Sequence, residues 1–133
     1  MALISVIIPS YNNFAGLLRA LMSISLQTGN ECFSYEIIII NDASADKKYH
    51  THKFDENVSL IHLDQHIGRI PTLCQMGHKQ ASGDFIAFLL DDHSWPMSKI
   101  DYQVYDMITH GKKYSYGTTI SDLMILKGEP FPL

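Results

Sequence analysis

Short apolar runs rich in β-branched residues are the main hydrophobic feature of this chain. Four such runs span residues 3–8, 35–40, 58–63 and 84–90. Three of them are nearly continuous rather than alternating, which is typical of strands that are covered on both faces. The pattern therefore predicts a central, largely parallel sheet. Residues 112–126 predict one further strand.

The segments between these runs carry apolar residues at helical spacing. One helix is expected over residues 14–26, where apolar side chains recur at steps of three and four, with Asn12 or Asn13 available as N-cap. A second is expected over 71–81 and a third over 97–110. Strands and helices thus alternate, with a polar link between the second and third strands. This order is typical of a doubly wound α/β domain.

Composition narrows the class of protein. At 133 residues and 46% apolar, the chain fits one globular domain covering residues 1–133. The net charge is -4, and no run of basic residues is longer than a pair. The sequence therefore lacks the positive charge that binds nucleic acid or an anionic membrane. No apolar run approaches the roughly 18 residues that span a bilayer, and the start lacks a signal-peptide pattern. Cys32 and Cys74 lack metal-type spacing. We expect a cytoplasmic domain with reduced thiols.

Polar residues follow three of the predicted strands. Ligands of open parallel sheets bind outside the carboxyl ends of the strands, so residues 9–12, 41–44 and 91–93 should line one edge. Taken alone, the first two segments are explained by turn chemistry. Asp91 and Asp92 differ, because adjacent carboxylates at the mouth of a buried strand repel each other and lose hydration. A bound cation would keep both ionised, although a solvated loop is an equal alternative.

Four segments in this order resemble the nucleotide-sugar-binding half of glycosyltransferase family 2. They are SVIIPSYNN, YEIIIINDASAD, IHLDQHIG and ASGDFIAFLLDDHSWP, and the similarity runs from about residue 3 to about residue 101. The resemblance implies an α/β fold of GT-A type, with a Rossmann-like, mostly parallel sheet flanked by helices. It also implies an inverting, metal-dependent transferase. Its donor would be a nucleotide-diphospho-sugar, with a lean to UDP-sugars, and its acceptor a hydroxyl of a glycan, lipid or other molecule.

The resemblance assigns roles to individual residues. Pro9 and Tyr11 match positions that flank the nucleotide base, and Asp42 matches the aspartate that accepts an N–H of the base. Asp91 and Asp92 match the D-x-D motif of the family. Asp91 would then bind ribose hydroxyls, and Asp92 would hold Mn²⁺ or Mg²⁺ on the diphosphate.

The sequence departs from the family's pattern at several positions. Leu90 stands at the first acidic position of D-x-D, His66 stands where asparagine is frequent, and His93 stands where a further aspartate is common. Arg69 is the best local candidate for a phosphate or base contact. An exposed arginine over a helix start is an equally good interpretation.

The chain ends at Leu133, before the region where the family carries its acceptor-binding half and its catalytic base. We therefore expect a C-terminally truncated fold with no identifiable catalytic residue, whose uncovered apolar surface favours a homo-oligomer. Two alternatives stay open. One is a non-catalytic nucleotide-sugar-binding module or a fragment without its catalytic base. The other is a flavodoxin-like or phosphoacceptor domain, in which an acidic pair at a strand end also suits Mg²⁺.

Overall fold

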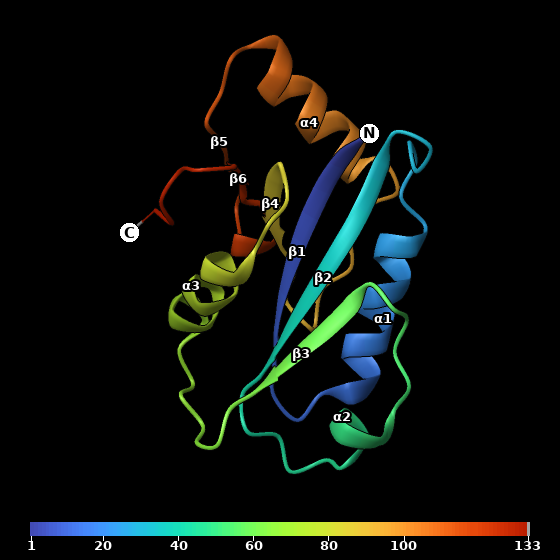
Figure 1. Cartoon of the computed structure of the whole chain (residues 1–133), viewed down its shortest axis with the longest axis vertical. Helices are drawn as coiled ribbons and strands as arrows, with labels where there is room; N and C mark the ends of the chain where they lie inside the picture. The colour runs from blue at the N-terminus through green and yellow to red at the C-terminus, as the bar shows by residue number, and fades with distance from the viewer. Residues whose placement is uncertain (133) are drawn as a thin grey trace.

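A twisted sheet runs through the middle of the computed structural model, which describes residues 1–132 (Figure 1). Its strands are β1 (Ala2–Ser10), β2 (Phe33–Asn41), β3 (Val58–His62), β4 (Phe85–Phe88), β5 (Tyr114–Ser115) and β6 (Met124–Leu126). Their order across the sheet is β3-β2-β1-β4-β6-β5. The first four pair in parallel, whereas β6 runs antiparallel to both β4 and β5. The carboxyl ends of the four parallel strands therefore share one edge.

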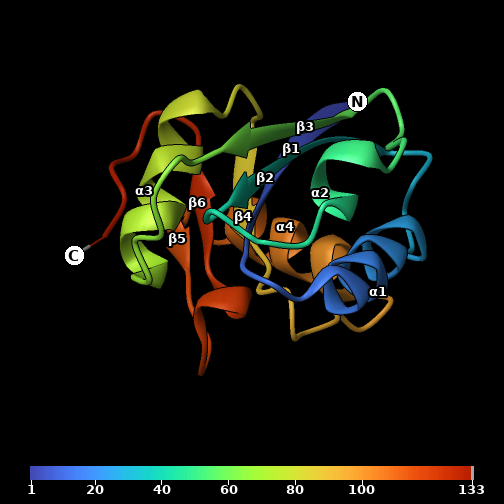
Figure 2. The same ribbon diagram turned by 90° about the horizontal axis from the view of Figure 1, so that it is seen from below.

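Helices cover both faces of the sheet (Figure 2). They are α1 (Phe14–Ser25), α2 (Lys48–Thr51), α3 (Ile70–Gln80) and α4 (Lys99–Thr109). Side chains of β1 alternate between two hydrophobic clusters, as a pleated strand requires. Val6 and Ile8 pack in the cluster with α1 and α4, and Ile7 packs in the other with α3. Every helix within residues 1–132 lacks the length and apolar character of a membrane span.

The predicted parallel strands and the three predicted helices are confirmed, with small shifts of their ends. The predicted strand over residues 112–126 is wrong as one element. It is divided into β5 and β6 by a loop and the 3₁₀ helix η1 (Ile120–Asp122). Asp122 accepts the backbone N–H of Thr119, and the Thr119 hydroxyl accepts that of Ser121. Such local bonds compete with strand pairing.

The polar link between β2 and β3 contains the short helix α2, which the sequence pattern did not predict. Four residues are too few to produce a helical period. Tyr49 of α2 is nevertheless among the largest fully buried side chains. Its ring meets that of Phe14 in α1 edge to face, with centroids 5.4 Å apart. The link therefore packs on the corner where β1 turns into α1.

Candidate functional site

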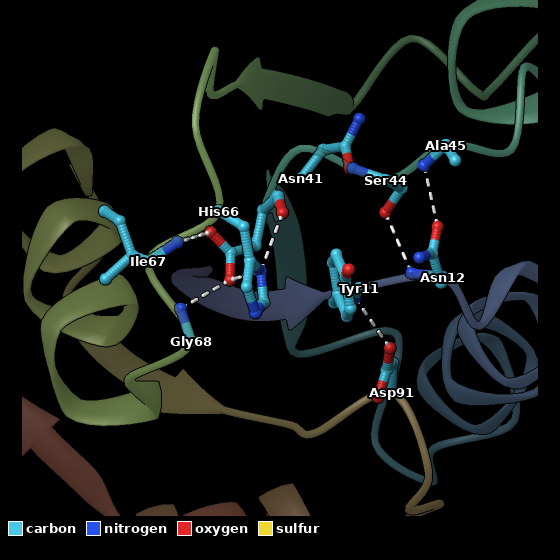
Figure 3. Close-up of polar contacts among 10 residues, drawn as sticks. Tyr11, Asn12, Asn41, Ser44, Ala45, His66, Ile67, Gly68 and Asp91 are labelled. Atoms are coloured by element: carbon cyan, nitrogen blue, oxygen red, sulfur yellow. Dashed lines mark hydrogen bonds and ion pairs between the residues drawn. The ribbon is translucent and has the colours of Figure 1, made fainter.

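The loops that follow β1, β2 and β4 meet at the carboxyl edge of the sheet, as predicted. The backbone N–H of Asp42 donates to the carbonyl of Ser10 at 2.9 Å. The hydroxyl of Ser10 donates to the carboxylate of Asp91 at 2.9 Å, and the backbone N–H of Tyr11 reaches the same oxygen at 3.2 Å. Residues far apart in the sequence thus form one small surface (Figure 3).

Unusual backbone conformations fix the shape of this surface. Asn12 and Ala43 adopt positive φ angles of 47° and 61°, and both lie in these loops. The Asn12 side chain accepts the backbone N–H of Ala45 at 2.7 Å, and the backbone N–H of Asn12 donates to the Ser44 hydroxyl at 2.9 Å (Figure 3). Such conformations persist only where surrounding contacts determine them, and they concentrate at functional sites.

Asp91 is half-buried and accepts the backbone N–H of Tyr11. Burial raises the pKa of the Asp91 carboxyl above its usual value, and the adjacent charge of Asp92 acts in the same direction. Hydrogen bonds from Ser10, Tyr11 and Asn13 oppose this rise. A carboxylate in this position is stabilised by a ligand that offers hydroxyl donors or positive charge.

Asp92 follows Asp91 on the loop after β4 and is exposed. Its side chain is 69% exposed, and a carboxylate oxygen lies 3.8 Å from Nε2 of His93. The other ring nitrogen of His93 is engaged by the hydroxyl of Ser121 at 2.7 Å. In the described part of the chain, residues 1–132, no cluster of three or more protein ligands could hold a metal alone. One free carboxylate still fits Mn²⁺ or Mg²⁺, because such ions take most remaining ligands from water and substrate phosphate.

Asp42 is almost completely buried, at 1% exposure, and it organises the loop between β3 and α3. One carboxylate oxygen accepts the backbone N–H of Ile67 at 2.7 Å, and the other accepts that of Gly68 at 2.9 Å. Gly68 has a φ of +72°, which lets the backbone turn toward the carboxylate. Nδ1 of His66 lies 2.8 Å from the carboxylate.

The imidazole of His66 also covers Tyr11. The two rings are stacked, with centroids 3.9 Å apart and an angle of 29° between their planes. Figure 3 shows both rings between the loop at Gly68 and the corner at Asn12. The sequence predicts no role for His66, which departs from the family's pattern at this position. Its sequence position gave no sign that it would fold onto Tyr11.

The surface encloses a cavity of about 230 Å³. Its lining residues are Pro9, Ser10, Tyr11, Asp42, His66, Gly68, Ile70, Leu73 and Asp91. Four of the six predicted site residues are therefore in the cavity wall. Asp92 lies beside it on the exposed loop after β4. Arg69 lines a neighbouring hollow with Pro71 and Gln75, because the chain is extended at Arg69 before it enters α3.

The chain is similar to known proteins in both sequence and structure. The family model described as glycosyl transferase family 2 matches residues 5–124. The UDP-Glc:alpha-D-GlcNAc-diphosphoundecaprenol beta-1,3-glucosyltransferase WfgD of Escherichia coli is 27% identical over 86% of this chain and 45% of its own length. The putative teichuronic acid biosynthesis glycosyltransferase TuaG of Bacillus subtilis is 28% identical over 96% of this chain and 50% of its own. The chain spans about half the length of these relatives.

Solved structures of TarS from S. aureus share the fold. The complex of TarS residues 1–349 with UDP-GlcNAc has a TM-score of 0.71 and 20% identity, and the match covers 98% of this chain and 37% of the TarS chain in that structure. The complex of the same TarS residues with UDP has a TM-score of 0.69 and 21% identity, over 98% of this chain and 38% of the TarS chain in that structure. The sheet and its helices are therefore GT-A-like. Because the family model covers most of its residues, this chain belongs to glycosyl transferase family 2.

Proposed function

We propose that this chain is the donor-binding part of a glycosyltransferase that uses a nucleotide-diphospho-sugar, with UDP-sugars as the favoured donors. The observation that carries the proposal is the convergence of Tyr11, Asp42 and Asp91 on one cavity at the carboxyl edge of the sheet. The names of similar proteins support it, since WfgD is described as using UDP-Glc and TarS was solved with UDP and UDP-GlcNAc.

The cavity offers the chemistry that a nucleoside needs. Tyr11 supplies an aromatic face beside Pro9, on which a planar base can stack. Asp42 supplies a buried acceptor for an N–H of the base. The carboxylate of Asp91 accepts hydrogen bonds from its own neighbours and is suited to accept ribose hydroxyls as well.

The diphosphate would lie at the open side of the cavity, toward Asp92. The exposed carboxylate of Asp92 would hold Mn²⁺ or Mg²⁺ together with phosphate oxygens. When bound, such an ion neutralises the charge that develops on the departing nucleoside diphosphate. We assign Arg69 to a phosphate contact from the neighbouring hollow, because its guanidinium suits bidentate recognition of phosphate.

The transfer itself is proposed from the family resemblance. An acceptor hydroxyl of a glycan, lipid or other molecule would attack the anomeric carbon directly, with inversion. We assign no catalytic base to residues 1–132. A non-catalytic nucleotide-sugar-binding module is the second candidate function. Assays of donor hydrolysis and of sugar transfer separate the two functions.

Calorimetry with UDP tests the donor site. We expect wild-type protein to bind UDP more tightly with Mn²⁺ than with EDTA. Asp92→Ala should lose this metal-dependent gain, and Asp91→Asn should weaken binding under both conditions. Asp55→Asn is the matched control, because Asp55 is exposed and lies outside the cavity. Absence of UDP binding by wild-type protein, with or without metal, would refute the proposal.

A further inference from the structure

His66 makes the two contacts that the proposed site offers to a nucleobase. Its ring is stacked on Tyr11 with centroids 3.9 Å apart. Its Nδ1 lies 2.8 Å from a carboxylate oxygen of Asp42 and 3.2 Å from the backbone oxygen of the same residue. Both facing atoms are acceptors, so Nδ1 carries a hydrogen. A planar ring with an N–H directed at Asp42 is also what a uracil presents.

We propose that His66 occupies the nucleobase position of the donor site and leaves it when a nucleotide binds. This inference rests on the proposed function, because it assigns a role within the same site. One face of Tyr11 and the acceptor group of Asp42 serve a single ring at a time. The imidazole and the base therefore compete for the same place.

The surrounding structure allows this exchange without unfolding the loop. The backbone N–H groups of Ile67 and Gly68 hold Asp42 independently of the imidazole, at 2.7 and 2.9 Å. The His66 side chain is 46% exposed, so it can rotate into solvent with little loss of packing. Asp42 then keeps both backbone bonds and receives the N–H of the base in place of that of His66.

The exchange also determines which bases fit. The group that replaces imidazole has to donate a hydrogen toward Asp42, as N3–H of uracil does. Cytosine presents an unprotonated N3 at the corresponding position. This N3 and the Asp42 carboxylate are both acceptors, so the bond that His66 made to Asp42 is not replaced. A binding site closed by His66 therefore opens for UDP in preference to CDP.

The affinity for UDP depends on the fraction of molecules in which His66 has left the site. For a ligand that binds only a fractionally populated state, the apparent dissociation constant equals the intrinsic one divided by that fraction. Replacement of His66 by a residue without a ring removes this competition. We expect the affinity for UDP to increase about 5- to 30-fold, the factor that corresponds to about 1–2 kcal/mol.

The experiment is calorimetry with UDP and Mn²⁺ on wild type, His66→Ala and His66→Asn, with thermal unfolding to show that each variant is folded. His66→Ala is expected to bind UDP about 5- to 30-fold more tightly than wild type, and His66→Asn should also bind more tightly. His110→Ala is the matched control, because His110 is exposed at the end of α4 and lies outside the cavity. It should bind like wild type.

Two results would overturn the inference and leave the proposed function intact. One is weaker binding by folded His66→Ala, which would make His66 a wall of the occupied site. The other is unchanged binding. Failure of every variant, wild type included, to bind UDP would remove both proposals together. In histidine-labelled wild-type protein, the ring signals of His66 should shift on addition of UDP, and those of His110 should not.

Discussion

Gly16, in the first turn of α1, lies directly against the backbone carbonyl oxygen of Asp91. A Cβ atom on Gly16 would collide with that oxygen and with the side chain of Asn13. Asn13 uses the same side chain to cap α1, accepting the N–H of Gly16 at 3.2 Å, and to donate to the Asp91 carbonyl at 3.3 Å. The start of α1 and the loop after β4 are thus fitted together at a residue without a side chain.

Replacement of Gly16 by alanine should therefore disturb the cavity. Alanine favours a helix interior by about 1 kcal/mol over glycine, but the collision with backbone at Asp91 should outweigh this preference. We expect a net loss of about 1–3 kcal/mol in the free energy of unfolding, together with weaker UDP binding. Urea unfolding and calorimetry measure the two effects. Arg19→Ala, at an exposed position of α1, should change neither. Wild-type stability in Gly16→Ala would contradict the prediction.

The hydroxyl of Tyr49 joins α2 to the corner between β1 and α1. It lies 2.6 Å from the hydroxyl of Ser10 and accepts the backbone N–H of Asn13 at 3.0 Å. Tyr49→Phe keeps the ring but leaves that N–H without its acceptor. We expect a loss of about 1–3 kcal/mol in the free energy of unfolding, measured in urea. Tyr102→Phe, at a position that is 76% exposed, should be neutral. Equal effects of the two substitutions would show that the Tyr49 bonds contribute nothing.

The architecture was predictable because the strands are buried on both faces. Continuous apolar runs such as residues 35–40 predict strands in a sheet that is covered on both faces. The alternation of these strands with helical segments predicts that the strands are parallel. Once the strands are parallel, Tyr11, Asp42 and Asp91 must share an edge, since each follows a strand end. The topology alone requires this convergence, and in the structure all three residues line one cavity.

The details of the cavity depend on contacts that have no sequence period. His66 reaches Tyr11 across 55 positions because the loop after β3 is drawn in by Asp42. Arg69 follows the turn at Gly68 and is directed to the neighbouring hollow. Neither effect can be predicted from the spacing of residues or from secondary-structure propensity. Both are set by hydrogen bonds between a buried carboxylate and a distant backbone.

Asp42 should stabilise the loop after β3 before any ligand is present. Asp42→Ala leaves the N–H groups of Ile67 and Gly68 without an acceptor. We expect a loss of about 2–4 kcal/mol in the free energy of unfolding and faster hydrogen exchange at these two amides. Asp64→Ala is the matched control, because Asp64 is exposed in the same loop. Unchanged exchange at Ile67 and Gly68 would mean that the loop is held by other contacts.

Lys99 is expected to make stability depend on pH above neutrality. Its stem is partly exposed, but its Nζ is buried 4.5 Å above the ring centre of Trp95, and no hydrogen-bond partner for it is found in residues 1–132. Burial lowers the pKa of Lys99 to about 7, although the charge of Asp122 opposes this. An unfolded lysine keeps its proton up to about pH 10.4. Between these values the unfolded chain binds the additional proton, so stability rises with pH.

The rise approaches about 1.4 kcal/mol per pH unit for one group. Cys74 acts in the opposite direction from about pH 8.5, because burial raises the pKa of its thiol to about 12, and reduces the slope near pH 9. Tyr35 does so only above about pH 10, because burial raises its pKa to about 12. Urea unfolding at pH 7, 8 and 9 should therefore show wild-type stability increasing. Lys99→Met should be more stable than wild type at pH 7 and should lack most of this slope. Lys127→Met, at an exposed position, should keep the slope. The same slope in Lys99→Met as in wild type would show that Lys99 is charged in the folded protein throughout this range.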